Sequence, residues 1–481
     1  MIEFKHELFT TLANKLGSYF VYLVGGSVRD YLSQYNSNYT KFKNKKVQDF
    51  DLVVFGCADL ESEIRNIANE QNLPFIVLDA ENQIYRIVNN EKKWQADFCG
   101  PRGKNIEEDL GKRDFIINAI AYDLAQKKII DPLNGQKDLE KKILQAISLD
   151  NLKADSLRVL RAFRLKAKFG LNIEPETCIM LSEAFVLIDS IAIERISAEI
   201  WGLLESENCF DSLKEFRDLG FFEKIFPEFL PQKEVPSNDF HHLPLWEHTF
   251  ELINQYENFV KPQLPKQCLN FIENNQINYI SWEAIIKMSC LLHDIAKPRT
   301  WEIIKGKHTF YNHDNLGAEM ALELGKRMHW PKAVTQSLSV LVKYHLRPFH
   351  IAPIGSEPTE KAERRFFRKL GDNFYPLIAL AWADLLSTRG AAISDEMIKN
   401  SELRLLNLCT NYEEFKKQEI KYEPLLAGED LKQAIELSKL PPSKLIKDIL
   451  KELQDLQLDN EIKTKEQAFN WFINRSQKYS N

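Results

Sequence analysis

The sequence contains no C-x-x-C pair, no long apolar run and no excess of basic residues. Its seven cysteines are scattered and odd in number, which excludes a disulfide framework and a thiolate zinc site and predicts a cytoplasmic location. No apolar stretch approaches the ~20 residues that cross a bilayer, and the N-terminal segment lacks the pattern of a signal peptide, so we expect no membrane association. The formal net charge of -6 excludes a surface that is basic throughout, so a polyanion site has to be a local patch.

The remaining composition is that of an ordinary globular protein with several domains. With 481 residues, 44% of them hydrophobic and 27% charged, the chain is long enough for about three domains. Residues 1 to about 150 alternate strand-like and helix-like segments, with 107–124 among the predicted helices. From about 150 onward apolar residues recur at helical spacing and predict an all-helical remainder, with a linker at 231–240 and a loop at 351–360.

The first chemical feature is the stretch LVGGSVRD, residues 23–30, where an apolar strand ends in two glycines. Gly25 and Gly26 would let the backbone approach a polyphosphate closely, and a helix that starts near Ser27 would add free N–H groups, with Arg29 in its first turn. On its own, this pattern is more often a plain strand-to-helix turn.

The second feature is a pair of carboxylates at the head of an apolar strand. Because alternate strand residues share a face, Asp49 and Asp51 project together while Phe50 enters the core. Two adjacent carboxylates repel each other unless a cation lies between them, and Mg²⁺ prefers such oxygen ligands together with substrate phosphate. Asp97, on a neighbouring predicted strand, is a candidate third acid. The alternative is an acidic strand end that faces solvent.

The order of these features resembles a known enzyme superfamily. The Gly-Gly-Ser turn, then about twenty residues, then Asp-x-Asp resembles the nucleotidyltransferases that include DNA polymerase β and poly(A) polymerases. KRDFIINAIAYD, residues 112–123, resembles the R-R-D-F-x-x-N-A motif of the bacterial-type (class II) tRNA nucleotidyltransferases, with Lys112 in place of the usual arginine. The resemblance implies that Arg113, Asp114 and Asn118 contact the ribose and triphosphate. From the residues alone, Asp114 and Asn118 would share one face of a helix, and a capped surface helix is the alternative.

The stretch KADSLRVLRAFR, residues 153–164, concentrates arginines in an acidic chain. If 155–168 is helical, Asp155 and Arg158 share a face, and Arg161 and Arg164 continue the stripe as phosphate or structural contacts. Asp155 could accept a hydrogen bond from the amino group of cytosine or adenine while Arg158 donates to the ring. Guanine and uracil present the opposite pattern and would leave buried groups unpaired.

This stretch also resembles the Glu-Asp-x-x-Arg motif with which the family selects nucleotides. The match supplies Asp155 and Arg158 and fails at Ala154, where the family has glutamate. IERISAEI, residues 193–200, resembles the family's next motif, which implies that Arg195 contacts nucleotide or RNA. The alternative for the stretch is an exposed salt bridge within one helix, worth about 0.3–0.5 kcal/mol.

A second group of candidate ligands lies in the predicted helical region. LLHDIAKP, residues 291–298, places a His-Asp pair in an apolar helix, with further histidines and an aspartate before and after it. Imidazole and carboxylate ligands suit a divalent metal, which would generate a hydroxide nucleophile for phosphoester hydrolysis. The pattern resembles the HD phosphohydrolase superfamily, in the form fused to some CCA-adding enzymes. The resemblance implies a metal bound by His248, His293, Asp294 and Asp384, assisted by His313 and His345. The alternative is a degenerate HD domain that keeps only the helical scaffold.

Together these features predict an α+β protein with four parts. They are a small α/β nucleotidyltransferase head (1–150), a helical neck that binds nucleobase and RNA (151–230), an HD-type helical body (240–390) and a helical tail (391–481). The lysine-rich segment 41–46 either contacts RNA phosphates or is a solvated loop.

The expected activity is Mg²⁺-dependent addition of C, A or both to the tRNA 3′ end, from CTP and ATP and without a nucleic-acid template. A second divalent metal is expected in the HD domain, and nothing in the sequence indicates an obligate protein partner. The alternatives are a CC-adding or A-adding partial enzyme, a poly(A) polymerase, and a phosphohydrolase whose head merely binds RNA.

Overall fold

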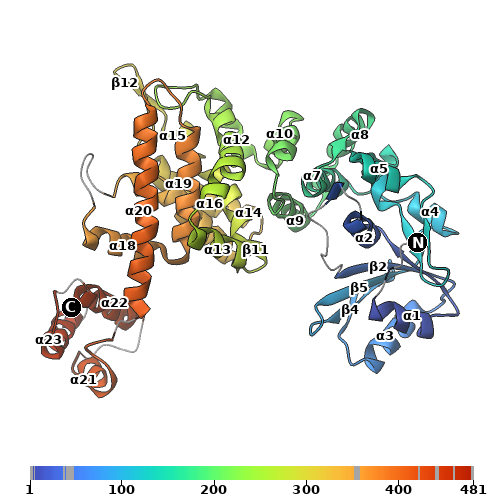
Figure 1. The fold of residues 1–481 in the computed structure, drawn as a ribbon, viewed down its shortest axis with the longest axis horizontal. Coiled ribbons are helices and arrows are strands. Elements are labelled where there is room, and N and C mark those ends of the chain that lie inside the picture. Colours follow the sequence, from blue (N-terminus) through green and yellow to red (C-terminus); the bar gives the residue numbers. More distant parts are fainter. Residues whose placement is uncertain are drawn as a thin grey trace. The chain divides into compact units, whose positions relative to one another are not determined.

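The computed structural model describes residues 4, 6–35, 38–39, 48–351, 358–420, 423–438, 444–458 and 461–477. The lysine-rich segment 41–46 and most of the predicted loop 351–360 lie outside these ranges. The chain divides into two compact units, Met1–Pro227 with Met328–Trp330 and Glu228–Arg327 with Pro331–Asn481 (Figure 1). Among the described residues, no helix is long and apolar enough to cross a membrane.

The head is built on a seven-stranded sheet with the order β3-β4-β5-β2-β1-β6-β7. The strands are β1 (Phe20–Val24), β2 (Asp49–Phe55), β3 (Phe75–Asp79), β4 (Ile84–Asn89), β5 (Trp94–Cys99), β6 (Ala121–Asp123) and β7 (Lys128–Ile130). Only β2 and β5 pair in parallel; the other neighbours are antiparallel. The first five strands are apolar runs rich in β-branched and aromatic residues, so the strand-like segments predicted in this part of the chain are confirmed.

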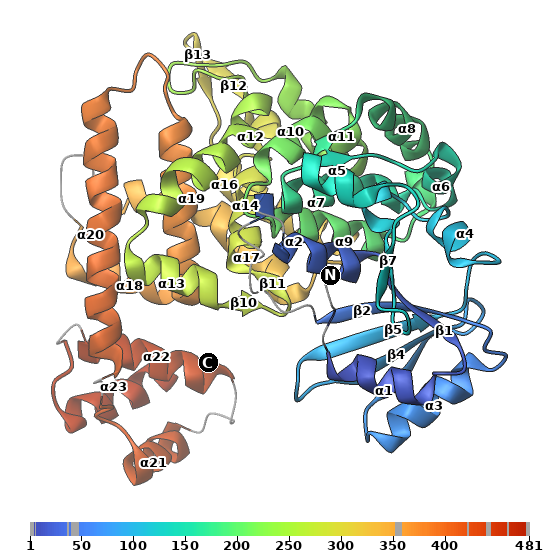
Figure 2. The ribbon, with the colours of Figure 1, turned by 45° about the vertical axis from the view of Figure 1, so that its right-hand side comes forward.

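Helices cover both faces of this sheet. They are α1 (Glu7–Lys15), α2 (Gly26–Tyr35), α3 (Leu60–Glu70), α4 (Ile106–Leu110) and α5 (Gly135–Lys141), with a 3-10 turn η2 (Ile116–Asn118). α1 and α3 lie on one side of the sheet and α2 on the other (Figure 2). The prediction of one helix over 107–124 is wrong. Residues 119–122 are buried on every side, which suits the interior strand β6, between β1 and β7, better than an amphipathic surface helix.

The neck is a bundle of short helices. It contains β8 (Ile143–Leu144), α6 (Leu149–Ala154), α7 (Leu157–Phe169), β9 (Asn172–Ile173), α8 (Pro175–Phe185), η3 (Ile188–Ser190), α9 (Ile193–Leu204), α10 (Phe210–Asp218) and α11 (Phe221–Ile225). The prediction that Asp155 begins a helix is wrong, because α7 starts at Leu157 and Asp155 is extended. The Asp155 carboxylate accepts from the Leu157 N–H (3.3 Å), a local contact that competes with helix formation.

The second unit is mainly helical, as predicted. After η4 (Pro227–Glu234) its elements are α12 (Leu245–Gln255), η5 (Tyr256–Val260), η6 (Lys261–Gln263), α13 (Lys266–Asn274), β10 (Gln276–Ile277), β11 (Ile280–Ser281), α14 (Trp282–Leu292), α15 (Lys297–Thr300), β12 (Glu302–Ile304), β13 (Lys307–Thr309), α16 (His313–Arg327), α17 (Lys332–Tyr344), η7 (Arg347–Phe349), α18 (Glu360–Leu370), η8 (Gly371–Asn373), α19 (Phe374–Ser387) and α20 (Asp395–Ile420). The apolar helix α19 is buried along almost its whole length.

Two expectations for this unit need correction. The remainder of the chain is not all helical, because β10–β11 and β12–β13 form two antiparallel hairpins. The stretch 231–240 is not a free linker, since its first residues continue η4 and both Gln232 and Val235 are buried.

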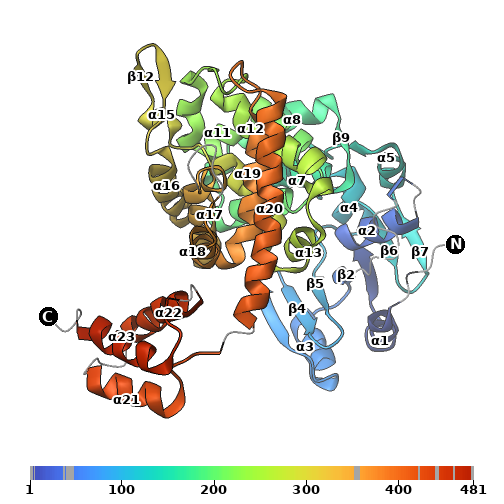
Figure 3. The same cartoon turned by 60° about the vertical axis from the view of Figure 1, so that its left-hand side comes forward.

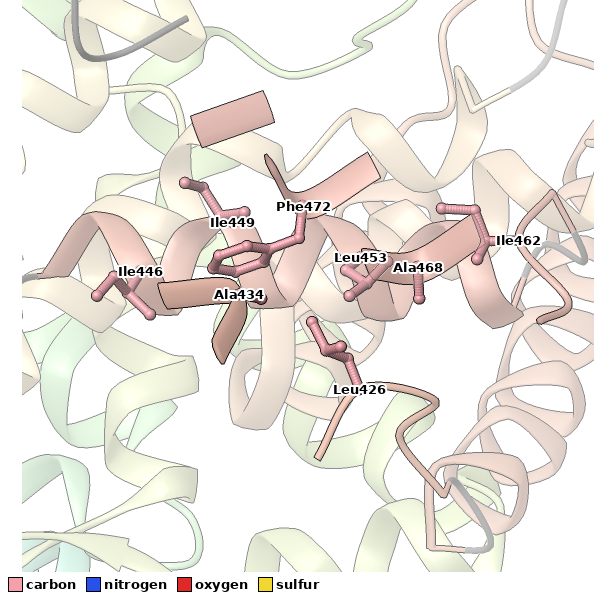
Figure 4. Packing of buried hydrophobic residues seen from close by; sticks show 8 residues of the cluster. All are labelled: Leu426, Ala434, Ile446, Ile449, Leu453, Ile462, Ala468 and Phe472. Carbon is pink, nitrogen blue, oxygen red and sulfur yellow. The ribbon is translucent and has the colours of Figure 1, made fainter. Parts of the chain in front are cut away.

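The last three helices of the predicted tail form a small module with its own core. α21 (Gly428–Ser438), α22 (Lys444–Leu458) and α23 (Lys465–Gln477) lie together (Figure 3). Their core contains Leu426, Ala434, Ile446, Ile449, Leu453, Ile462, Ala468 and Phe472 (Figure 4). Because the core gathers residues from all three helices, we infer that these helices stabilise one another by apolar burial.

Candidate functional site

The register of the sheet brings the predicted carboxylates together. Asp51 on β2 lies directly beside Val24 at the end of β1 and beside Asp97 on β5. Asp49 and Asp51 are both exposed, whereas Phe50 between them is 4% exposed. The prediction that the two carboxylates share one face of the strand is therefore confirmed, and Asp97 joins them from the neighbouring strand.

The glycine turn after β1 packs directly against this face. Gly25 has φ +67°, and a Cβ atom there would lie 2.7 Å from Nη1 of Arg113 and 3.8 Å from Oδ2 of Asp51. The Ser27 hydroxyl donates to the Val24 carbonyl (2.9 Å) and accepts from the backbone N–H of Asp51 (3.4 Å). Ser27 thus ties the turn to the carboxylate strand, and only glycine leaves room for the Arg113 guanidinium.

Electrostatics single out Asp51 within the acidic face. The pKa of the Asp51 carboxyl is raised, first by partial removal from water and then by the nearby carboxylates of Asp97 and Asp49, against the opposing effect of Arg113. The Asp97 carboxylate accepts hydrogen bonds on both oxygens from Arg86, which lies directly opposite on β4 (2.6 and 2.8 Å). Sequence reasoning missed Arg86, and its cross-strand position was the signal that could have revealed it. A divalent cation bound at Asp49 and Asp51 would relieve the repulsion between these carboxylates.

Several residues predicted to bind nucleotide are hydrogen-bonded to one another. Buried Arg29 donates to the Asp30 carboxylate (2.8 Å from Nε) and to Oδ1 of Asn118 (2.5 Å). Lys168, at the end of α7, donates to the other Asp30 oxygen (2.9 Å). Asn118 in turn donates to the Asp114 carboxylate (2.9 Å). The expected proximity of Asp114 and Asn118 is confirmed, although a 3-10 turn and not an α-helix produces it.

The arginine stripe of α7 continues this chain. Arg161 donates to Asp114 (3.1 Å) and pairs with Glu199 of α9 (3.5 Å), and Arg164 donates to the second Glu199 oxygen (2.6 Å). Burial alone would raise the pKa of Asp114, but Arg161 and hydrogen bonds hold it below its usual value. Gly202 makes room for the Arg164 side chain, since a Cβ there would lie 2.5 Å from its Cδ. Glu199 was not predicted, because its burial is not visible in the sequence.

The predicted nucleobase readers Asp155 and Arg158 do not pair with each other. Asp155 accepts from Arg195 of α9 (2.8 Å). Arg158 uses Nη1 to donate to the carbonyls of Asn151 (2.9 Å) and Lys112 (3.3 Å). The salt bridge within one helix that was the alternative reading is therefore absent. Both side chains remain partly accessible, so their nucleotide-reading role stays a prediction.

The second unit gathers all six predicted metal-site residues in one buried cluster. They come from α12, α16, α19 and the ends of α14 and α17, and are His248, His293, Asp294, His313, His345 and Asp384. Oδ2 of Asp294 lies 3.0 Å from Nε2 of His293 and 3.7 Å from Nε2 of His248. Oδ1 of Asp294 lies 3.4 Å from Nε2 of His313 and 3.8 Å from Nε2 of His345. Asp294 therefore faces two separate histidine pairs.

Backbone contacts orient these imidazoles. Three of them place Nδ1 against the carbonyl three residues earlier: His293 with Cys290 (2.8 Å), His313 with Phe310 (2.6 Å) and His345 with Val342 (2.7 Å). A carbonyl accepts only from a protonated Nδ1, so in the neutral ring Nε2 keeps its lone pair for a metal. Burial, and then the neighbouring His293, lowers the pKa of His345 to about 4, which keeps this ring neutral.

Unsatisfied polar atoms show that a divalent cation suits this cluster. Both ring nitrogens of His248, Oδ1 of Asp294 and Oδ1 of Asp384 are buried without a hydrogen-bond partner. Such atoms are costly unless a ligand engages them. The nitrogen and oxygen donor set is typical of divalent transition metals.

Two cluster neighbours were missed by sequence reasoning. Lys297 lies 2.5 Å from Oδ2 of Asp294 and 3.3 Å from Nε2 of His241. Burial alone would raise the pKa of Asp294, but His293 and Lys297 hold it well below its usual value. Burial, and then Lys297, lowers the pKa of His241 to about 2. The signals were present as the lysine of HDIAKP and the double histidine at 241–242.

The first unit thus has the sheet, glycine turn and paired acids of a nucleotidyltransferase head, and the second has the buried cluster of an HD domain. Comparison with known families agrees: residues 21–145 match the poly A polymerase head domain, 170–233 the probable RNA and SrmB-binding site of polymerase A, and 280–389 the HD domain. The chain therefore carries the head, RNA-binding and HD domains that these three family models describe.

Relatives and a solved structure extend over nearly the whole chain. The A-adding tRNA nucleotidyltransferase of Deinococcus radiodurans is 28% identical over 93% of both chains. The CC-adding tRNA nucleotidyltransferase of Thermus thermophilus is 27% identical over 92% of this chain and 91% of its own. The structure of the Thermotoga maritima CCA-adding enzyme complexed with tRNA matches 97% of this chain and 94% of that one, with a TM-score of 0.53 and 18% identity, which shows a shared fold.

Proposed function

We propose that the protein transfers nucleotides from CTP and ATP to the 3′ end of tRNA, without a nucleic-acid template. The observation that carries this proposal is the acidic face of β2, where Asp49 and Asp51 stand beside Gly25 and Arg113. The names of the D. radiodurans and T. thermophilus relatives support tRNA as the acceptor. All seven cysteines are free, which supports a reducing cytoplasmic environment.

In this proposal Asp49 and Asp51 hold Mg²⁺, which when bound neutralises charge on the triphosphate and favours loss of pyrophosphate. The terminal hydroxyl of the RNA loses its proton to solvent, and its oxygen forms the new ester bond at the α-phosphorus as the bond to pyrophosphate breaks. The glycine turn lets the phosphates approach the backbone, and Arg113, whose Nε is buried without a partner, offers them a donor. Catalysis then consists of positioning and charge stabilisation.

Asp155 and Arg158 are proposed to select the base. A carboxylate has about four acceptor sites and a guanidinium five N–H donors. The contacts of Asp155 with Leu157 and Arg195, and those of Arg158 through Nη1 alone, leave capacity on both groups. Cytosine and adenine match that remaining pattern, whereas uracil and guanine leave a buried donor or acceptor unpaired.

The decisive experiment supplies defined tRNA ends with single nucleotides. Purified protein receives tRNAs that end at the discriminator base, at C or at CC, with CTP and ATP added separately and together, and product lengths are read on a gel. Complete CCA addition is expected. Addition of A only to the CC end would identify an A-adding enzyme, addition that stops at CC would identify a CC-adding enzyme, and long A tails would identify a poly(A) polymerase. The nearly equal identity to an A-adding and a CC-adding relative makes this experiment necessary.

We propose a second activity, metal-dependent phosphoester hydrolysis, at the HD cluster. It is supported by the unsatisfied ligand atoms and by the two oxygens of Asp294, which face two histidine pairs and offer positions for two ions. A bound divalent ion would lower the pKa of a water molecule to near neutrality. The water oxygen would bond to phosphorus as the ester P–O bond breaks, and the leaving oxygen would take the proton.

Two measurements test this second activity. Calorimetric titration with Mn²⁺ should show binding that Asp294→Asn weakens. Hydrolysis of p-nitrophenyl phosphate esters should require the same ion. Failure of Mn²⁺, Ni²⁺ and Zn²⁺ to bind would leave the cluster as a structural remnant.

A further inference from the structure

The β12–β13 hairpin and the residues that follow it form an exposed element beside the HD cluster. The hairpin projects from the helical body in each view (Figures 2 and 3). Its strands pair in the register Ile303 opposite His308 and Ile304 opposite Lys307. Among the described residues it pairs with no third strand, and an isolated two-stranded hairpin is only marginally stable in water.

The surface of this element is apolar and aromatic. Ile303 is 64% exposed, Ile304 42% and Tyr311 73%. The rings of Trp301 and His308 stack with an interplanar angle of 23°, and the indole N–H donates to Nδ1 of His308 (2.8 Å). The hairpin thus carries a fixed aromatic pair, and the exposed Tyr311 ring follows it in the chain.

The charge of the same segment is opposite to that of the whole chain. Residues 297–311 contain four basic residues and one acidic residue in a protein of net charge -6. Within the part of the chain that the structure describes, no carboxylate pairs with Arg299, Lys305 or Lys307, and all three are exposed. Free cations beside exposed rings are the combination with which proteins hold single-stranded nucleic acid, by phosphate contacts and base stacking.

The base of the hairpin contacts the HD cluster. Lys297 lies 2.5 Å from Asp294 and, on its other side, 5.4 Å from the centre of the Phe310 ring. The carbonyl of Phe310 accepts from Nδ1 of His313 (2.6 Å). A strand of nucleic acid that lies along the hairpin would therefore lie beside Lys297 and Phe310, which contact residues of the cluster.

We propose that the segment from Arg299 to Tyr311 binds single-stranded RNA and guides its phosphodiester backbone to the HD cluster. The proposal rests on the hydrolytic function proposed for that cluster and names its substrate class: a polynucleotide, not a free nucleotide. Tyr311 supplies a stacking surface, and Lys305 and Lys307 contact phosphates.

The chain offers a matched control for this surface. Tyr279, in the β10–β11 hairpin of the same unit, is 71% exposed and has no basic residue within its hairpin. A stacking role predicts that Tyr311→Ala weakens RNA binding and that Tyr279→Ala does not, although both remove an exposed ring of the same size.

The test uses the full chain and an oligonucleotide of about ten residues that carries 4-thiouridine. Irradiation followed by peptide mapping should give adducts within 299–311. In fluorescence anisotropy, Tyr311→Ala should weaken binding about tenfold or more. The double variant Lys305→Ala and Lys307→Ala should reduce the slope of log affinity against log salt by roughly 1.4, which is about 0.7 for each lost phosphate contact.

The proposal would be overturned if adducts formed only outside 299–311 and if the Tyr311 and lysine variants bound RNA as well as Tyr279→Ala does. The exposed surface would then be assigned to a protein partner. Titration with Mn²⁺ alone tests the cluster separately. Adducts without metal binding would reject the hydrolytic centre and keep the RNA site. Metal binding without adducts would reject the RNA site alone.

Discussion

Replacing Gly25 with alanine should remove most nucleotide transfer while it destabilises the fold only slightly. The new Cβ would lie 2.7 Å from Nη1 of Arg113, close to the carboxylate of Asp51. Because Nη1 is the end of a flexible side chain, the clash is relieved by moving Arg113, not by unfolding. Gly170 provides a matched control, since its φ of +64° is nearly that of Gly25 and a Cβ there meets nothing within 4 Å.

Gly25→Ala and Gly170→Ala should therefore lower the free energy of unfolding by similar amounts but have different effects on the rate of nucleotide transfer. Each places alanine in the left-handed region, at a cost of about 1–2 kcal/mol. To reach an ordinary contact of roughly 3.5 Å or more, Arg113 has to shift by close to 1 Å, and a misplacement of that size costs about 100-fold in rate. This loss corresponds to about 2.7 kcal/mol in the barrier. We expect Gly170→Ala to keep the wild-type rate.

The assay combines urea unfolding with initial rates of CTP and ATP incorporation into tRNA. The expected result is two similar unfolding free energies and a rate ratio near 100 between Gly170→Ala and Gly25→Ala. Rates within threefold of each other would refute the close packing of turn and guanidinium as a catalytic requirement. A much larger loss of stability for Gly25→Ala would show that the backbone, not Arg113, absorbs the clash.

Three further changes test separate parts of the molecule. Arg158→Ala should reduce discrimination of CTP against UTP about tenfold, because a base-specific donor is lost. The KM for tRNA should change little. An equal loss of nucleotide discrimination and tRNA binding would mean that residues 153–164 act only as a basic patch. Asp294→Asn should weaken Mn²⁺ binding at least about tenfold in calorimetry, and unchanged affinity would remove Asp294 from the ligand set. Lys287→Met should cost about 3–5 kcal/mol in urea unfolding, because Lys287 is fully buried and pairs with the buried Glu257 carboxylate (2.9 Å). Adding Glu257→Gln should restore part of that loss, and no recovery would assign the loss to the second partner of Lys287, the Glu283 carboxylate (3.2 Å).

Features set by local spacing were predictable from the sequence. The shared face of Asp49 and Asp51 follows from the two-residue period of a strand, and the pattern of apolar runs located the strands around it. The six residues of the HD cluster were also named in advance, because the resemblance supplied positions on helices that are far apart in the chain. Their roles in catalysis and metal binding stay predictions.

Features set by tertiary contacts were not predictable in the same way. The segment 107–124 has apolar residues at spacings that suit a helix, yet the sheet needed a strand between β1 and β7, and burial decided the outcome. Glu199 and Arg86 looked like ordinary charged residues until the fold placed arginine and aspartate beside them. The β12–β13 hairpin was overlooked because its two turn residues, Lys305 and Gly306, both have positive φ, and lysine is not a residue that marks such a turn in a sequence.

The linked polar groups of the head and neck affect how mutational data on this enzyme should be interpreted. Charged and amide side chains alternate without interruption along Lys168, Asp30, Arg29, Asn118, Asp114, Arg161, Glu199 and Arg164. Removing any one takes a partner away from each of its neighbours, so single-residue effects will not add, and an apparent defect in nucleotide affinity can originate far from the nucleotide. Arg29 of α2 and Glu199 of α9 are not neighbours in this series. Double-mutant cycles between them would measure how far such coupling extends.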